Sequence, residues 1–212
     1  MSGVDTLQPQ SNFDITASIE LISYRGAQIR SLIPELAKLR IEIFKEYPFL
    51  YDGSEENEYR YLNKFTEVED AVAILAFDGK VIIGAITGLP FVYEDSDSKR
   101  PFLEHSLDPE KYFYLSELIL KKAYRGRGIG RRLFDLCEEY AFRLRRFSYA
   151  CFCTVNRATN DPKRPLDYKS PQHLWNKKGY KPHPELTCDF VWKEVGESVP
   201  SSKEMVFWIK RL

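Results

Sequence analysis

The sequence predicts one α/β domain with a mixed sheet, in which both antiparallel and parallel strand pairs occur. Two apolar runs, residues 71–77 and 80–87, are separated by Asp78-Gly79, a two-residue turn typical of an antiparallel hairpin. Residues 112–120 and 148–155 are apolar runs joined by an amphipathic helical pattern, an arrangement that connects parallel neighbours. The length of 212 residues is ample for one domain with its own core.

The N-terminal part of the chain predicts a tail, a strand and a helix. Residues 1–14 are polar and predict a flexible tail, so that a single domain spans residues 15–212. Residues 17–24 are rich in Ile and Leu with partial alternation, and they predict the first strand. A helix is expected next, between Ser31, a suitable N-cap, and Pro48, which stops its apolar pattern.

A second helix is expected after an aromatic loop at residues 47–53. Ser54 can cap its N-terminus, where three glutamates suit the positive end of the helix dipole. Its apolar side consists of Tyr59, Leu62 and Phe65. Residues 94–109 are polar and contain two prolines, so they predict an excursion with a short helix before the strand at 112–120.

The C-terminal part continues with helix and strand patterns. An amphipathic helix is expected from Gly130, with apolar residues at helical spacing. After a polar insertion at residues 156–169, a short helix is predicted at 171–178. Two final strands are expected at 186–192 and 205–212.

Composition excludes several classes of protein. Lys plus Arg and Asp plus Glu number 31 each, so no net charge directs the chain to nucleic acid or to an acidic membrane. No run approaches the ~18 apolar residues of a membrane span, and no secretory signal pattern is present, so a cytoplasmic location is expected. The cysteines lack zinc-site spacing and predict reduced core residues without a metal. They are Cys137, Cys151, Cys153 and Cys188.

A glycine-rich segment, Arg-Gly-Arg-Gly-Ile-Gly at residues 125–130, lies between a strand and a helix. Glycines let backbone N–H groups approach a phosphate, and a helix N-terminus adds partial positive charge. A dinucleotide fingerprint is disfavoured because Arg131 occupies the position of its third glycine, and the Gly-Lys-Ser/Thr ending of a triphosphate loop is missing. The surrounding arginines suit a pyrophosphate. They are Arg125, Arg127, Arg131 and Arg132.

Residues 117–133 read Glu-Leu-Ile-Leu-Lys-Lys-Ala-Tyr-Arg-Gly-Arg-Gly-Ile-Gly-Arg-Arg-Leu. This stretch resembles the acyl-CoA-binding motif of the GNAT superfamily of N-acetyltransferases, whose core is Gln/Arg-x-x-Gly-x-Gly/Ala. Residues 174–180 resemble the family's aromatic-x-x-x-Gly-aromatic segment. The resemblance implies a GNAT-like fold, in which a mostly antiparallel central sheet is flanked by helices and its parallel strand pair is splayed at the acyl-CoA site.

The resemblance also implies acetyl-CoA as the co-substrate. Backbone groups of the strand would hold the pantetheine arm, and N–H groups of the glycine loop would hold the pyrophosphate. The residues expected to bind acetyl-CoA are Leu118, Ile119, Leu120, Arg125, Gly126, Arg127, Gly128, Ile129, Gly130 and Arg131.

Acetylation requires a neutral amine, yet a lysine-like ammonium has a pKa of ~10.4. Glu117 is the expected general base, because it is the only carboxylate in an apolar strand and matches a position where some family members keep a base. The alternative interpretation is a carboxylate that pairs with a nearby arginine or simply faces the outer edge of the sheet. In the family a tyrosine commonly protonates the departing thiolate, and the matching position here is Trp175. An indole N–H cannot serve as a practical proton donor. Either Tyr168 or another tyrosine replaces it, or the thiolate leaves unassisted.

The expected reaction is direct transfer of the acetyl group to a primary amine of a small molecule or amino acid. Aromatic residues make up 14% of the chain, which favours an aromatic-walled acceptor pocket. Its expected members are Tyr47, Tyr51 and Trp175. The alternatives are a protein N-terminus or lysine as acceptor, and an acyl-CoA-binding module without catalysis. The sequence is compatible with a homodimer.

Overall fold

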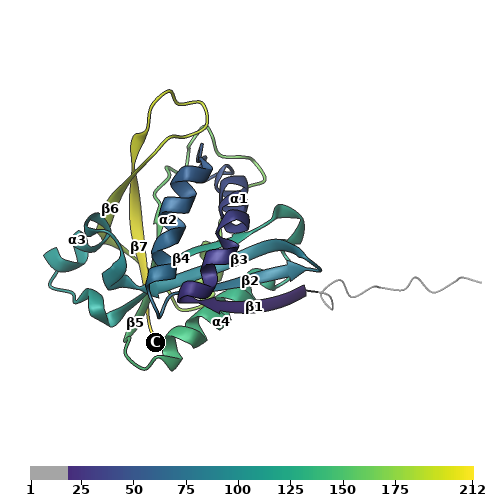
Figure 1. Ribbon diagram of the computed structural model, residues 1–212. Helices are drawn as coiled ribbons and strands as arrows, with labels where there is room; N and C mark the ends of the chain where they lie inside the picture. Colours follow the sequence, from purple (N-terminus) through teal and green to yellow (C-terminus); the bar gives the residue numbers. More distant parts are fainter. Residues whose placement is uncertain (1–18) are drawn as a thin grey trace, which may run out of the picture.

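The computed structural model describes residues 19–212, so the expected tail at 1–14 lies outside the described residues. Within them, seven strands form one sheet in the order β1-β2-β3-β4-β5-β7-β6 (Figure 1). They are β1 (Ile19–Arg25), β2 (Val72–Asp78), β3 (Val81–Pro90), β4 (Tyr112–Leu120), β5 (Tyr149–Val155), β6 (Lys181–Trp192) and β7 (Ser201–Arg211). Neighbours are antiparallel except β4 and β5, which are parallel, so the predicted mixed sheet is confirmed.

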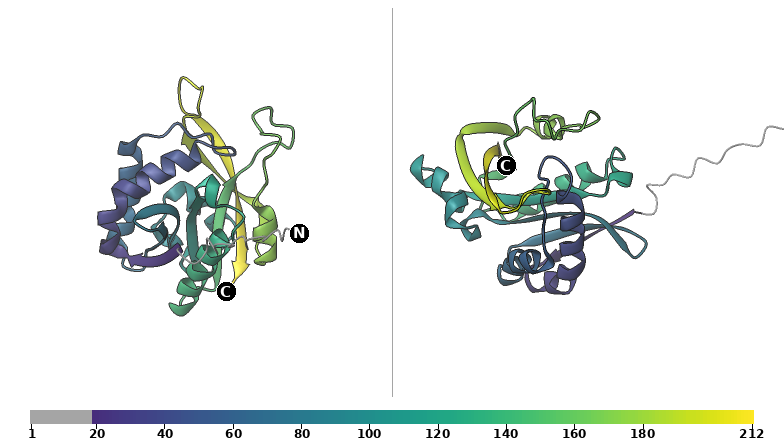
Figure 2. Two further views of the ribbon diagram at one scale, coloured as in Figure 1. Left: turned by 90° about the vertical axis from the view of Figure 1, so that its right-hand side faces the viewer. Right: turned by 90° about the horizontal axis from the view of Figure 1, so that it is seen from above.

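Helices cover both faces of the sheet (Figure 2). In the described part of the chain these are α1 (Ile33–Phe44), α2 (Glu55–Glu67), α3 (Ser96–Glu104), α4 (Ile129–Arg143) and α5 (Gln172–Lys177). Helices α1 and α2 pack on one face, where Leu36, Leu62 and Phe65 are fully buried. Helix α4 packs on the other face through Leu133 and Cys137. An apolar core layer therefore lies on each face of the sheet.

The predicted first strand, the hairpin and the second helix are confirmed, but the start of the first helix differs. The hairpin forms as expected, and Ser54 accepts a hydrogen bond from the Asn57 N–H at 3.4 Å. The prediction that Ser31 is the N-cap is wrong, because residues Gly26–Leu32 form a 3-10 helix and α1 begins at Ile33. Gly26 has φ +43°, which turns the chain into that 3-10 helix directly after β1.

The last two strands are longer than the sequence predicts. Strand β6 begins at Lys181 rather than at residue 186, and β7 begins at Ser201 rather than at residue 205. Pro182 and Pro184 obscure the strand pattern, but β6 is the last strand of the sheet, where proline is tolerated. Its register with β7 shifts between His183 and Thr187.

Strand β4 carries the irregularity that shapes the centre of the sheet. Its pairing with β3 shifts from Thr87 with Glu117 to Gly88 with Leu115, so Ser116 is an extra residue in a β-bulge. On the other side, β4 pairs with β5 only over residues 112–114. Beyond this point the two parallel strands separate, and the predicted splay is confirmed.

Candidate active site

The separation of β4 from β5 leaves part of the β4 backbone without a neighbouring strand. The Lys121 N–H donates to Ile83 of β3 at 2.9 Å, and amides of alternate residues point to opposite edges of a strand. The backbone groups of Leu118 and Leu120 are therefore directed toward β5. The Leu120 carbonyl accepts a hydrogen bond from Arg125 Nε at 2.9 Å. The Leu118 and Leu120 N–H groups can bind an extended amide-containing chain such as pantetheine.

The glycine loop follows β4 and leads into α4. Gly126 and Gly128 have φ +80° and +81°, and Gly128 is the N-cap of α4. These left-handed conformations favour glycine, whereas a Cβ at either position would meet no protein atom within 4 Å. A Cβ at Gly130 would also meet none. The loop thus presents its backbone openly at the start of a helix.

The first turn of α4 supplies free hydrogen-bond donors. The Arg132 N–H donates to the Gly128 carbonyl at 3.1 Å, whereas the N–H groups of residues 129–131 have no helix carbonyl four residues before them to accept a hydrogen bond. They carry the positive end of the helix dipole. This arrangement fits the two phosphates of a pyrophosphate.

The arginines of the loop have different neighbours. Arg125 connects the loop to α1 and to the end of β4. Its Nη1 donates to Glu46 of α1 at 2.7 Å, and its Nε donates to the Leu120 carbonyl. Arg127 lies 5.4 Å from the centre of the Tyr124 ring, and Arg131 is 3.8 Å from Asp135. Both arginines are nevertheless exposed to solvent.

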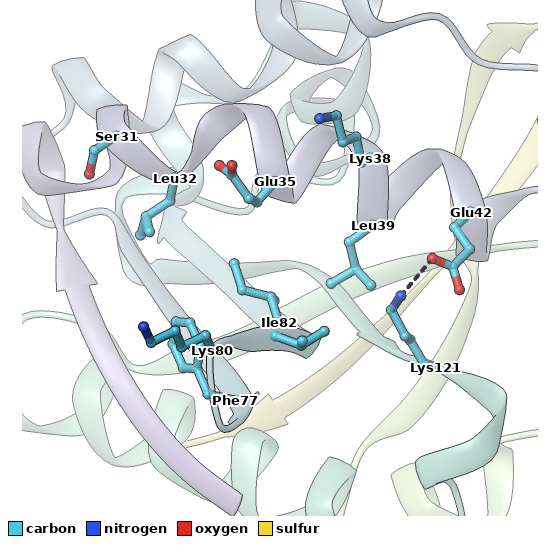
Figure 3. Close-up of a pocket in the computed structure, with 11 residues that line it drawn as sticks. Ser31, Leu32, Glu35, Lys38, Leu39, Glu42, Phe77, Lys80, Ile82 and Lys121 are labelled. Carbon is cyan, nitrogen blue, oxygen red and sulfur yellow. Dashed lines mark ion pairs between the residues drawn. The ribbon is translucent and has the colours of Figure 1, made fainter.

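A groove of about 560 Å³ lies between α1 and the β2–β3 hairpin (Figure 3). The pair Lys121–Glu42, with atoms 2.9 Å apart, lies at one end of the groove. Lys38 and Glu35 line the α1 side, and Lys80 lines the hairpin side. The groove contains none of the residues that the sequence predicts for the active site.

Glu117 lies on the α1–α2 face of β4, beside the bulge. Its side chain has 0% exposure and contacts Arg40 of α1, which also contacts Glu58 of α2. The Tyr61 hydroxyl is 3.5 Å from Glu117 Oε2. The other carboxylate oxygen, Oε1, is buried without a hydrogen-bond partner among the described residues. The arginine partner of the alternative interpretation is thus present, and one oxygen of Glu117 remains free.

Two distant loops pair on the same side of the sheet as Glu117. The Asp52 N–H donates to the Lys193 carbonyl at 2.8 Å, and the Val195 N–H donates to the Leu50 carbonyl at 2.7 Å. Between them, Tyr51 and Glu194 form an antiparallel bridge. The α1–α2 loop is therefore joined through its backbone to the β6–β7 loop.

The insertion after β5 locks this pairing. Glu194 is 1% exposed and contacts Arg157 and Lys163, both from the insertion. Arg157 Nε also donates to the Pro48 carbonyl at 2.8 Å. We call the paired segments 48–52 and 193–195, together with Arg157 and Lys163, the clasp.

The predicted acceptor residues divide between the two faces of the sheet. Tyr47 and Tyr168 lie edge to face, with ring centres 4.7 Å apart, next to the clasp. Tyr51 belongs to the clasp, and burial with the nearby Glu58 carboxylate raises its pKa to about 12. Trp175 packs instead against Phe152, at 5.0 Å, in the apolar cluster of the α4 face. The structure brings Tyr47, Tyr51 and Tyr168 to one region but not Trp175.

Sequence reasoning missed Arg40, Glu58 and the charged residues of the clasp. A signal for the first two is present in the helical spacing. Arg40 continues the buried positions Ile33 and Ala37 along α1, and Glu58 lies four residues before the buried Leu62 on α2. A charged residue in phase with an apolar stripe indicates a buried ion pair. The clasp has no comparable local signal.

A family model for the acetyltransferase (GNAT) family matches residues 36–166, more than half of the chain. The match includes the bulged strand, the splayed pair and the glycine loop. The chain belongs to the GNAT family. This GNAT protein is therefore an acyltransferase that depends on acetyl-CoA, as the resemblance implied. No curated protein sequence matches it.

Solved structures of GNAT proteins share its fold across nearly their whole length. An acetyltransferase from Thermus thermophilus is 15% identical, with a TM-score of 0.55 over 92% of this chain and 97% of the other. Arabidopsis thaliana NAA60 in complex with acetyl-CoA is 14% identical, with a TM-score of 0.59 over 92% and 98%. A ribosomal-protein-alanine N-acetyltransferase from Brucella melitensis is 17% identical, with a TM-score of 0.56 over 90% and 99%.

Two features are absent from the described residues. No helix between residues 19 and 212 is long and apolar enough to cross a membrane. In the same part of the chain, no three His, Cys, Asp or Glu side chains are grouped so that they could hold a metal ion.

Proposed function

We propose that this GNAT protein transfers the acetyl group of acetyl-CoA directly to a primary amine of a small molecule or amino acid. The observation that carries the proposal is the opening between β4 and β5 above the glycine loop. Acetyl-CoA supplies an activated acetyl group as a thioester. The N–H groups of residues 126–131 would hold its pyrophosphate, and those of Leu118 and Leu120 its pantetheine arm.

Glu117 is the proposed general base for the acceptor. Its free Oε1 can accept a proton from the ammonium, directly or through a water molecule. Tyr168 is the proposed donor to the departing thiolate. Burial, with the neighbouring Tyr47, raises the pKa of Tyr168, so its hydroxyl stays protonated at neutral pH and can donate.

The clasp supports a small acceptor rather than a polypeptide. Its two backbone hydrogen bonds and its bridge join the loops on the Glu117 side, and an extended peptide would need a path between them. Tyr47 and Tyr51 would contribute aromatic surface to an amine with an apolar part. Trp175 is proposed to act only indirectly, by supporting Phe152 of β5.

Thiol release from acetyl-CoA tests this function against a panel of small amines, amino acids and short peptides with free N-termini. Mass spectrometry of the products assigns the acetylated nitrogen. We expect turnover with at least one small primary amine and none with the peptides. Turnover with peptides alone would favour the polypeptide alternative, and acetyl-CoA binding without any turnover would favour a non-catalytic module.

A further inference from the structure

Three buried charged side chains from three elements meet beside the bulge of β4. Arg40 contacts Glu58 through Nε and Glu117 through Nη1, and the three side chains are 10%, 3% and 0% exposed. The guanidinium carbon lies 4.2 Å from the centre of the Tyr61 ring. Because a buried charge is costly without a partner, each of these groups restrains the others.

The two oxygens of Glu117 have different environments. Arg40 and the Tyr61 hydroxyl both lie next to Oε2, while Oε1 is buried and has no partner among the described residues. The hydroxyl of Thr87, the cross-strand neighbour of Glu117, is also buried without a partner there. Buried polar atoms normally have a hydrogen-bond partner, so these two groups are available to a ligand or a water molecule.

We propose that Arg40 is the positioning residue of Glu117: it occupies Oε2, fixes the orientation of the carboxylate, and leaves Oε1 free for the proton of the acceptor ammonium. The inference rests on the proposed function, in which Glu117 is the base. One guanidinium between two carboxylates also leaves an excess negative charge, which favours a cationic acceptor.

The proton balance of the step is simple. The ammonium N–H bond breaks and its proton passes to Oε1, so that the amine keeps the electron pair. The amine nitrogen then forms a bond to the thioester carbon, and the carbon–sulfur bond breaks. Tyr168 protonates the departing thiolate and is reprotonated by the second proton lost by the nitrogen, while Glu117 returns its own proton to solvent.

Arg40 retains its charge in the core. Burial alone would lower the pKa of Arg40, but Glu117, Tyr61 and Glu58 together hold that pKa above its ordinary value. Other elements contribute further titratable groups near Glu117. The charged and titratable groups around it are Arg40 on α1, Glu58, Tyr61 and Lys64 on α2, Glu94 after β3, and Cys137 on α4.

An infrared titration tests the inference without requiring turnover. The carbonyl band of a protonated carboxylic acid is followed against pH in the wild type, Arg40→Met and Arg40→Met/Glu117→Gln. In Arg40→Met we expect a band to appear about one pH unit or more above its wild-type position, since an adjacent arginine shifts a carboxylate by about that amount. The double variant must lose this band, which assigns it to Glu117 rather than Glu58 or Glu94. An unshifted band would overturn the inference.

The pH dependence of kcat/KM gives the functional counterpart. In Arg40→Met, the acidic limb should move to higher pH and kcat should fall about 10²-fold, whereas KM for acetyl-CoA should stay within about twofold. Arg40→Lys, which keeps a cation, should restore most of the rate. The matched control is Arg60→Met, because Arg60 is an exposed arginine of α2 whose ion pair is with the exposed Glu56.

A uniform loss of rate at every pH would mean that Arg40 is only structural, and it would overturn the inference. If Arg40→Met fails to fold, Glu58→Gln replaces it. That isosteric variant leaves Arg40 to Glu117 alone and should move both the band and the acidic limb to lower pH. If the wild type binds acetyl-CoA but turns over no amine, the proposed function fails, whereas the infrared titration still decides the role of Arg40.

Discussion

The glycine loop and the clasp border the same centre, but they are built in opposite ways. The loop is one continuous segment whose shape follows from Gly126 and Gly128 at positive φ. The clasp joins three segments that are distant in sequence, the α1–α2 loop, the insertion after β5 and the β6–β7 loop. A local backbone conformation therefore determines the proposed cofactor side, whereas tertiary contacts determine the proposed acceptor side.

The two regions also differ in how they use charge. Around the loop, arginines lie at an exposed helix N-terminus, where a phosphate can reach them. In the clasp, the Glu194 carboxylate is buried and neutralised by Arg157 and Lys163. The loop is therefore suited to a ligand that binds and leaves, and the clasp to holding two loops together.

The largest effect is expected from Gly128→Val, a substitution that changes only the glycine loop. A branched side chain at φ +81° is strained, and its atoms would extend into the space where the phosphates are expected. We expect acetyl-CoA affinity to fall about 100-fold, equivalent to about 2.7 kcal/mol, in a calorimetric titration. Thermal stability should fall only by the backbone strain, as it does in the control variant that follows.

Gly79→Val is the matched control. Gly79 also has positive φ, +58°, and open space around it, but it lies in the β2–β3 hairpin. This variant should lose stability and keep its acetyl-CoA affinity. Equal affinities in the two variants would show that the loop does not bind the co-substrate.

Glu194→Gln removes the central carboxylate of the clasp. Removing the charge leaves Arg157 and Lys163 without their carboxylate, and breaking such a buried pair costs about 2–3 kcal/mol where one partner is partly exposed. We expect the Asp52 and Val195 amides to exchange faster with deuterium, KM for the small amine to rise, and short peptides to become acceptors. Glu185→Gln, at an exposed position on the preceding strand β6, is the control.

The sequence predicts the local features of the molecule, such as the glycine loop, but not the clasp. The hairpin, β4 and the glycine loop depend on neighbouring residues, so turn chemistry and spacing predict them. Glu117 is predicted as a buried charge because β4 is otherwise apolar. The clasp depends on contact between residues 141 positions apart, for example the Asp52 N–H donating to the Lys193 carbonyl at 2.8 Å. No local pattern contains such a contact.

Gly53→Ala tests the packing of the clasp with one methyl group. A Cβ at Gly53 would lie 2.3 Å from Tyr51 Cε1, so the ring must move. Gly53 lacks a positive φ, and the effect is therefore steric. We expect a loss of about 1–2 kcal/mol in unfolding free energy and a higher KM for the amine. An unchanged KM would indicate that Tyr51 has no part in acceptor binding.

The smallest expected effect is a loosening of the clasp when the pH is lowered. Hydrogen bonds from the Glu194 N–H and Ser201, with the charge of Lys203, lower the pKa of Glu197 to about 2. Burial would raise the pKa of Glu194, but hydrogen bonds from Lys163 and Arg157 outweigh it and lower that pKa. A carboxylate whose pKa is lower in the folded than in the unfolded protein stabilises the fold at pH values above its unfolded pKa, near 4.5. This stabilisation is lost as the pH falls toward the folded pKa.

Acid should therefore loosen the clasp before the sheet. Between about pH 4.5 and about pH 2, the protection factors of the Asp52 and Val195 amides should fall about 2- to 5-fold. The Lys121 amide, which bonds to Ile83 inside the sheet, provides the internal reference and should keep its protection over this range. Parallel loss at all three amides would mean that the molecule unfolds as one unit, and that the clasp has no separate electrostatic lock.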